Sequence, residues 1–162
     1  MKLAEHLTTS EGFLDLGMVD EAWAELDETE PVERAHPSVI AMRLRILQRM
    51  ERFETGAEIA RGAVRLHPED LDIRLLGAVH VRRATGAGEA LRFRQDITEP
   101  FLGHGGYWLR FAGHLCLHCE LGDLERTAEC TRRAVDIDRR FQIKVLDHPD
   151  LAPLRASWFG TE

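Results

Sequence analysis

The chain has 162 residues, and its 28 acidic and 21 basic side chains give a formal net charge of −7 at neutral pH. Hydrophobic residues make up 44% and charged residues 30% of the sequence, which excludes an intrinsically disordered chain. No charge-free stretch approaches the ~18 residues that a membrane-spanning helix needs. The acidity argues against a general nucleic-acid-binding protein, which normally has a basic surface.

The first residues lack the apolar stretch of a secretory signal, so we expect no signal peptide. Three cysteines are an odd number and do not make a disulfide framework. We therefore expect a cytoplasmic protein that folds without disulfides and without contact with a membrane.

Apolar residues recur along the chain at spacings of three and four rather than two. One such series is Ile40, Leu44 and Leu47, which matches one face of an amphipathic helix. Prolines fall between segments of this kind, at Pro31, Pro37, Pro68 and Pro100. The sequence therefore predicts an all-α fold of helices that alternate with short breaks.

A small residue recurs in a similar local context at intervals of 34, 34 and 37 residues. The four residues are Ala22, Gly56, Ala90 and Thr127. A small side chain lets two helices cross closely, whereas a large one would push their backbones apart. Five residues earlier we expect a turn in each case, at Gly17, Glu51, Thr85 and Gly122. This spacing places the starts of four repeats at residues 3, 37, 71 and 108.

The clearest copies run from Glu54 to Pro68 and from Leu121 to Asp138. The pattern resembles the tetratricopeptide repeat (TPR), whose 34-residue unit is a helix–turn–helix. The copies are degenerate, because His6, Arg74 and His118 occupy positions where the family favours a large apolar residue. A related helical solenoid with a similar period is the alternative.

The resemblance covers residues 1–141 as a TPR-like array and implies a right-handed superhelical solenoid of about four helix–turn–helix repeats. We expect residues 142–162 to form a C-terminal capping segment of the same domain, because a terminal repeat must cover its exposed apolar face. The apolar residues suited to this capping are Ile143, Val145, Leu146, Leu151 and Leu154.

In arrays of this kind, the first helix of each repeat lines a concave groove that binds a partner protein or peptide. The resemblance places these residues in the groove: Met42, Arg45, Arg49, Leu75, Val79 and Arg82. Guanidinium groups around an apolar floor would suit a partner with an acidic segment. The alternative is that the arginines are solvated or paired with the acidic first repeat, since residues 1–34 carry ten acidic and two basic side chains.

The segment Cys116-Leu117-His118-Cys119 is the most suggestive group for chemistry. On a helix, Cys116 and Cys119 share a face that His118 does not, so a zinc site would need a ligand from another helix. We expect buried structural cysteines and no resident metal or cofactor.

The chain also lacks a nucleophile elbow and a phosphate-binding loop, so we expect no enzyme. The favoured function is a non-catalytic scaffold for protein–protein interaction. The alternatives are a metal- or redox-responsive protein that uses Cys116 and Cys119, and an accessory subunit of an enzyme.

Overall fold

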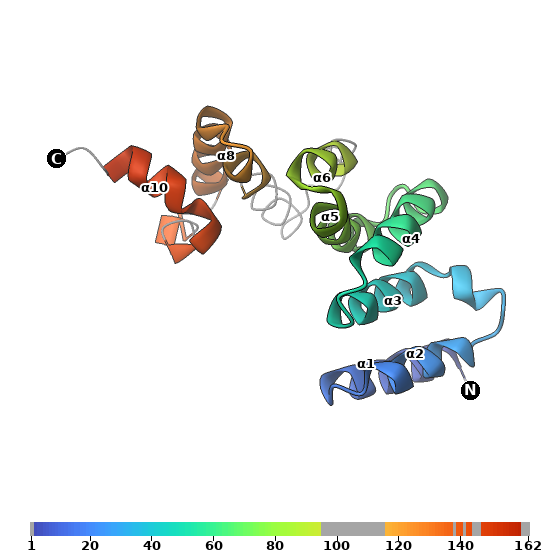
Figure 1. Ribbon diagram of the computed structural model, residues 1–162. Helices are drawn as coiled ribbons and strands as arrows, with labels where there is room; N and C mark the ends of the chain where they lie inside the picture. The colour runs from blue at the N-terminus through green and yellow to red at the C-terminus, as the bar shows by residue number, and fades with distance from the viewer. Residues whose placement is uncertain (1, 95–115, 138, 141, 144–146, 160–162) are drawn as a thin grey trace. The chain divides into compact units, whose positions relative to one another are not determined.

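The computed structural model describes residues 2–94, 116–137, 139–140, 142–143 and 147–159. All regular secondary structure in these ranges is helical (Figure 1), so the all-α prediction is confirmed for the described part of the chain. Within the same ranges, no helix has the length and apolar character needed to cross a bilayer. The chain forms two compact units, Met1–Ala84 and Thr85–Glu162, and we describe each by itself. The boundary between them falls inside the predicted repeat array.

The first unit contains five α-helices and one 3-10 helix along its described residues. They are α1 (Leu3–Asp15), α2 (Val19–Asp27), η1 (Glu33–Ala35), α3 (Pro37–Arg49), α4 (Phe53–Leu66) and α5 (Leu71–Thr85, whose last residue belongs to the second unit). The starts of α1, α3 and α5 coincide with the predicted repeat starts at residues 3, 37 and 71. The fourth predicted start, residue 108, lies outside the described residues.

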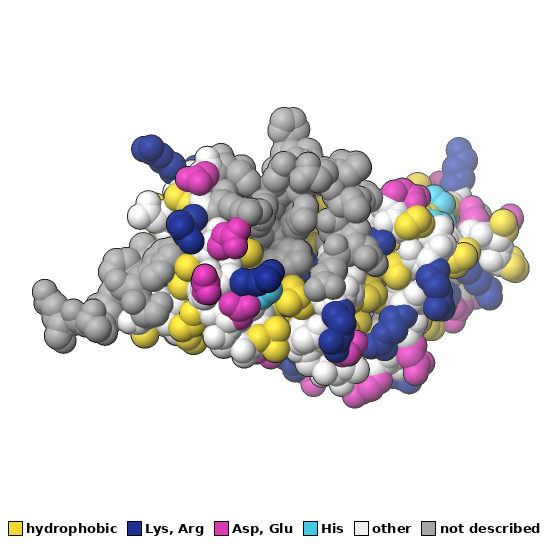
Figure 2. All heavy atoms as spheres, turned by 90° about the horizontal axis from the view of Figure 1, so that it is seen from above, with side chains coloured by type: hydrophobic (Ala, Val, Ile, Leu, Met, Phe, Trp, Pro, Cys, Tyr) yellow, Lys and Arg dark blue, Asp and Glu magenta, His cyan; other side chains and the backbone are white. Residues whose placement is uncertain are grey.

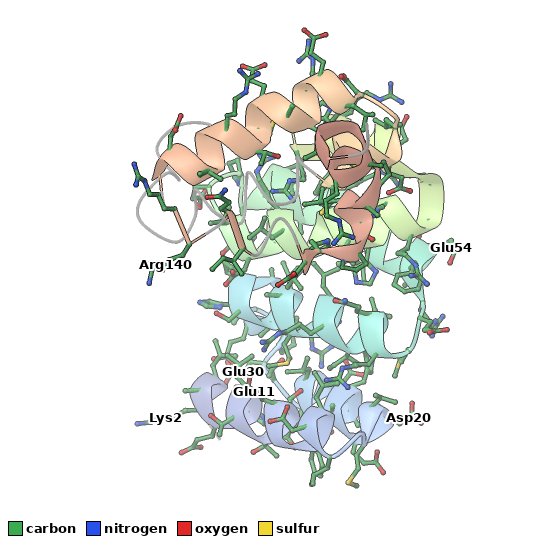
Figure 3. The ribbon with its side chains drawn as sticks, turned by 90° about the vertical axis from the view of Figure 1, so that its left-hand side faces the viewer. Lys2, Glu11, Asp20, Glu30, Glu54 and Arg140 are labelled. Atoms are coloured by element: carbon green, nitrogen blue, oxygen red, sulfur yellow. The ribbon has the colours of Figure 1, made fainter. Side chains whose placement is uncertain are left out.

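Helices α1 and α2 lie side by side, and α3 packs against both of them (Figure 1). Lys2 lies just before α1, and Asp20 lies in the first turn of α2. Because the two helices are antiparallel, these two residues lie at opposite ends of the hairpin (Figure 3). The buried side chains between the three helices are Leu14, Ala22, Leu26, Met42 and Ile46. They supply the apolar contact that holds the hairpin against the next helix.

Side chains at the helix starts satisfy backbone amides that have no partner inside the helix. Pro37 occupies the first turn of α3, where the missing amide proton costs nothing, and the His36 ring accepts a hydrogen bond from the Ser38 amide. Asp70 accepts from the amide of Ile73 at 2.9 Å at the start of α5. These local signals fix where α3 and α5 begin.

Three of the predicted turns share one backbone geometry. Gly17, Glu51 and Gly122 have positive φ angles of 77°, 55° and 76°. In each turn one amide donates to the carbonyl five residues before it, at 2.9 Å: Met18 to Phe13, Arg52 to Leu47 and Asp123 to His118. This bond ends the preceding helix in a compact turn. The prediction for the third repeat was wrong by one residue, because Thr85 ends α5 and Gly86 has the positive φ, 102°.

The four predicted small residues are all buried. Ala22, Ala90 and Thr127 are fully buried, and Gly56 is buried within α4. At Gly56 the reason is a direct contact with the ring of His80 on α5. The requirement for a small residue is therefore confirmed at this position by packing.

The polar residues that depart from the repeat pattern each have a polar neighbour. Buried His6 on α1 donates from Nδ1 to Glu25 Oε1 on α2 at 2.7 Å. Buried Arg74 donates from Nε to the Pro68 carbonyl at 3.0 Å. A buried polar group with a partner avoids most of its desolvation cost, so these substitutions are compatible with the helical packing.

The second unit contains α6 (Ala87–Arg94), α8 (Leu124–Ile137), η3 (Pro149–Leu151) and α10 (Ala152–Phe159), and residues 116–120 are also helical. Helix α10 packs against α8 and η3. Leu151 and Leu154 are buried, as expected for a capping segment, whereas Ile143 is exposed, so its predicted burial was wrong. Val145 and Leu146 lie outside the described residues.

Candidate functional site

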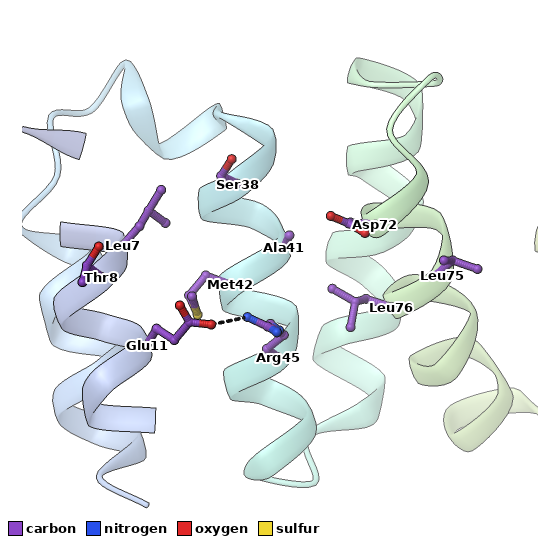
Figure 4. A pocket seen from close by; sticks show the side chains of 10 residues that line it. All are labelled: Leu7, Thr8, Glu11, Ser38, Ala41, Met42, Arg45, Asp72, Leu75 and Leu76. Carbon is purple, nitrogen blue, oxygen red and sulfur yellow. Dashed lines mark hydrogen bonds and ion pairs between the residues drawn. The ribbon is translucent and has the colours of Figure 1, made fainter. Parts of the chain in front are cut away.

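A pocket of about 470 Å³ lies along α1, α3 and α5 of the first unit (Figure 4). Its lining residues are Leu7, Thr8, Glu11, Ser38, Ala41, Met42, Arg45, Asp72, Leu75 and Leu76. A second pocket of about 320 Å³ is lined by Glu11, Leu14, Asp15, Arg45, Gln48, Arg49 and Leu76. Because Glu11, Arg45 and Leu76 line both pockets, we treat the two as one feature and call it the groove.

The residues that line the groove repeat with a spacing of 34. Leu7, Ala41 and Leu75 form one such series, and Thr8, Met42 and Leu76 form another. The remaining lining residues pair at the same spacing: Glu11 with Arg45, Leu14 with Gln48, Asp15 with Arg49, and Ser38 with Asp72. The groove is therefore formed by equivalent faces of three helices that begin 34 residues apart.

Four of the six sequence-predicted site residues line the groove: Met42, Arg45, Arg49 and Leu75. Val79 and Arg82, one and two turns further along α5, do not line either of these two pockets. Val79 is exposed and Arg82 is half-buried. The structure therefore brings together the residues from α3 and from the first half of α5.

Sequence reasoning missed the contribution of α1, which provides Leu7, Thr8, Glu11, Leu14 and Asp15 to the groove. The signal was present, because each of these residues stands 34 positions before a groove residue of α3. Applying the same repeat positions to the start at residue 3 would have identified all five.

The charges of the groove are mixed. Arg45 donates to Glu11 Oε1 at 3.0 Å (Figure 4), and Figure 3 shows Glu11 on the side of α1 that faces α3. The two side chains are 50% and 53% exposed, so the pair contributes at most about 1 kcal/mol to folding. The structure therefore shows Arg45 paired with an acidic residue of the first repeat.

Arg49 differs from Arg45, because its side chain makes no hydrogen bond or ion pair with another described residue. The same holds for Asp72 and Asp15 among the residues that the structure covers. The groove therefore offers a guanidinium group and carboxylates that have no side-chain partner among the described residues. On the face that it presents, Figure 2 shows basic and acidic side chains interspersed with hydrophobic ones.

The apolar part of the groove consists of side chains that retain some exposure. Leu7, Ala41, Leu75 and Leu76 are half-buried, whereas Met42 is buried. Thr8 and Ser38, which carry hydroxyl groups, line the same pocket. This surface can take up an apolar side chain, with polar groups at its edge to orient the rest of a ligand.

The cysteines lie in the second unit. Cys116 and Cys119 are 9% and 4% exposed and pack with Leu151 and Leu154. None of the three cysteines forms a disulfide, and all three are within the described residues. The burial that we expected for Cys116 and Cys119 is therefore confirmed.

Several polar side chains lie near these cysteines. Burial lowers the pKa of His118, although Asp123, whose Oδ2 lies 3.8 Å from Nδ1, acts in the opposite direction. The Cys116 Sγ atom lies close to a ring nitrogen of His148 and a carboxylate oxygen of Asp150. Cys116 therefore has candidate metal ligands that come from outside its own helix.

Comparisons with protein-family models, with curated proteins and with solved structures found no match to this chain. The resemblance to the tetratricopeptide repeat therefore stays a prediction from the sequence.

Proposed function

We propose that this protein is a non-catalytic interaction module that binds a partner protein or peptide in the groove. The main support is the 34-residue spacing of the groove-lining residues on α1, α3 and α5. As part of the same proposal, the hairpins are TPR-like repeats of a right-handed solenoid in the cytoplasm. Residues 142–162 would cover its C-terminal end.

The apolar floor would provide most of the binding energy. A partner side chain placed between Leu7, Leu75 and Leu76 would bury apolar area on both sides of the contact. Complete burial of a leucine-sized side chain is worth about 1.5–3 kcal/mol. A few such contacts give the modest affinity that is typical of peptide recognition.

The charged margin would set the direction of the bound segment. Ser38 and Asp72 lie toward one end of the larger pocket and Arg45 toward the other (Figure 4). Arg49 extends the second end, and its guanidinium group is the open partner for a carboxylate. We therefore propose that an acidic segment of the partner lies at the Arg49 end, with its apolar residue over Leu75.

Selection of random peptides on the immobilised full chain tests this function. Ala41→Glu places a carboxylate in the lining of the groove. We expect this variant to bind the selected peptides about tenfold more weakly or worse. Ala24→Glu is the matched control, because Ala24 is an exposed residue of α2 outside the groove lining. Selected peptides that bind both variants equally well would contradict the proposal.

A further inference from the structure

Three side chains with different donor atoms converge in the second unit. The Cys116 sulfur, a His148 ring nitrogen and an Asp150 carboxylate oxygen all lie within 4.8 Å of one another. Cys116 belongs to helical residues 116–120, whereas His148 and Asp150 flank Pro149 at the start of η3. We propose that these three side chains bind a Zn²⁺ ion, which is a function separate from the groove.

The donor set is the first argument for zinc. Thiolate sulfur, imidazole nitrogen and carboxylate oxygen are the three ligand types that Zn²⁺ uses in proteins. A thiolate disfavours Mg²⁺ and Ca²⁺, which prefer all-oxygen sites. One thiolate and one carboxylate also balance the charge of a divalent ion, once the Cys116 thiol has lost its proton to solvent on binding.

The packing around the group holds its two segments together. Leu151 and Leu154 are buried in the same cluster as Cys116, so the backbone just after Asp150 is anchored against the helix of Cys116. The Leu151 amide donates to the His148 carbonyl at 3.1 Å. This hydrogen bond closes the turn that carries His148 and Asp150. The convergence therefore depends on buried contacts and not only on exposed side chains.

The distances need only a small adjustment. Zinc–ligand bonds of about 2.0–2.3 Å at tetrahedral angles place ligand atoms about 3.3–3.7 Å apart. His148 and Asp150 are exposed, so their side chains can rotate through the remaining distance toward Cys116, which is 9% exposed. Three protein ligands leave the fourth position for water or another donor.

This ligand set differs from the one considered in the sequence analysis. That hypothesis paired Cys116 with Cys119, whereas the structure groups Cys116 with His148 and Asp150 and leaves Cys119 outside the group. Cys119 is 4% exposed and packs in the apolar cluster. It therefore serves as a matched control, since it is a buried thiol only three residues from the proposed ligand.

The test uses the full chain, stripped of metal with a chelator under reducing conditions, and titrates it with Co²⁺ as a spectroscopic substitute for Zn²⁺. We expect one equivalent to produce a thiolate–Co²⁺ charge-transfer band, which Zn²⁺ then removes. Cys116→Ser should lose this band and Cys119→Ser should keep it. His148→Gln and Asp150→Asn should each weaken Zn²⁺ binding by about tenfold or more, measured against a chromophoric chelator.

Three results would overturn the site: no binding of Zn²⁺ by the wild-type chain, equal loss of the band in both cysteine variants, or wild-type affinity in His148→Gln and Asp150→Asn. Circular dichroism checks that each variant is folded. If Cys116→Ser does not fold, the two exposed ligands decide the question, because their substitution leaves the apolar cluster intact.

Discussion

The imidazole ring of His80 on α5 packs directly against the backbone of Gly56 on α4. A methyl group at Gly56 would overlap this ring. His80 is fully buried, and its Nε2 donates to the Leu44 carbonyl on α3 at 2.8 Å. One side chain therefore connects three successive helices, and Gly56 provides the space for it.

Gly56→Ala should therefore destabilise the protein. Glycine to alanine normally stabilises a helix by up to about 1 kcal/mol, but here the added methyl group must displace a buried ring, and overpacking typically costs about 1–3 kcal/mol. Urea unfolding would measure the change. Gly62→Ala in the same helix is the control, because a methyl group there meets nothing within 4 Å and should stabilise. Equal stabilisation by both variants would show that His80 does not occupy this position.

Glu51→Gly should stabilise the protein by up to about 1 kcal/mol, since a non-glycine residue in the left-handed region carries a cost of about 1–2 kcal/mol that glycine's own entropy only partly offsets. Glu51 is exposed and has a φ of 55°. Glu54→Gly, at an exposed position in the first turn of α4, should destabilise instead. Thermal or urea unfolding of the two variants compares them directly, and a loss of stability in Glu51→Gly would contradict the expected strain.

Ala90→Leu should cost about 1–3 kcal/mol, because Ala90 is fully buried in α6 and a larger side chain overpacks its surroundings. Ala24→Leu on the exposed face of α2 should change the free energy of unfolding by less than about 0.5 kcal/mol. Unfolding midpoints of the two variants provide the comparison. A wild-type midpoint for Ala90→Leu would mean that this position is not a close helix crossing.

The repeat spacing made much of the first unit predictable. Small residues 34 positions apart mark helix crossings, so Ala22, Gly56 and Ala90 predicted the starts of α1, α3 and α5. Turn positions followed from the same spacing, except at Thr85, where the chain leaves the helix one residue later.

Contacts that cross between distant segments were not predictable from local patterns. Nothing near Gly56 in the sequence indicates that His80 fills the space beside it. Likewise, Cys116 and His148 lie in different segments, and no short motif joins them. The resemblance also assigned Val79 and Arg82 to the groove, and neither residue lines either of the two pockets that form it.

Substitution of the two groove arginines should have different effects on peptide binding. Arg49→Glu should slow the association of an acidic peptide selected on the wild-type chain, because its guanidinium group is open to a new carboxylate. Arg45→Ala should have a smaller effect, since Arg45 is already paired with Glu11. Association rates measured across a salt series separate the two, because salt screens the contribution of Arg49. Equal rates for wild type and Arg49→Glu at low salt would mean that Arg49 does not contact the peptide.

The most direct measurement of the groove proposal is an amide NMR titration of the full chain with a peptide obtained by the selection described above. We expect the largest shifts at lining residues on all three helices, such as Thr8 on α1, Ala41 on α3 and Leu75 on α5. Exposed α2 positions such as Ala24, which lie outside the groove lining, should stay unchanged. Shifts confined to α2 and α4, with α1, α3 and α5 unaffected, would contradict binding in the groove.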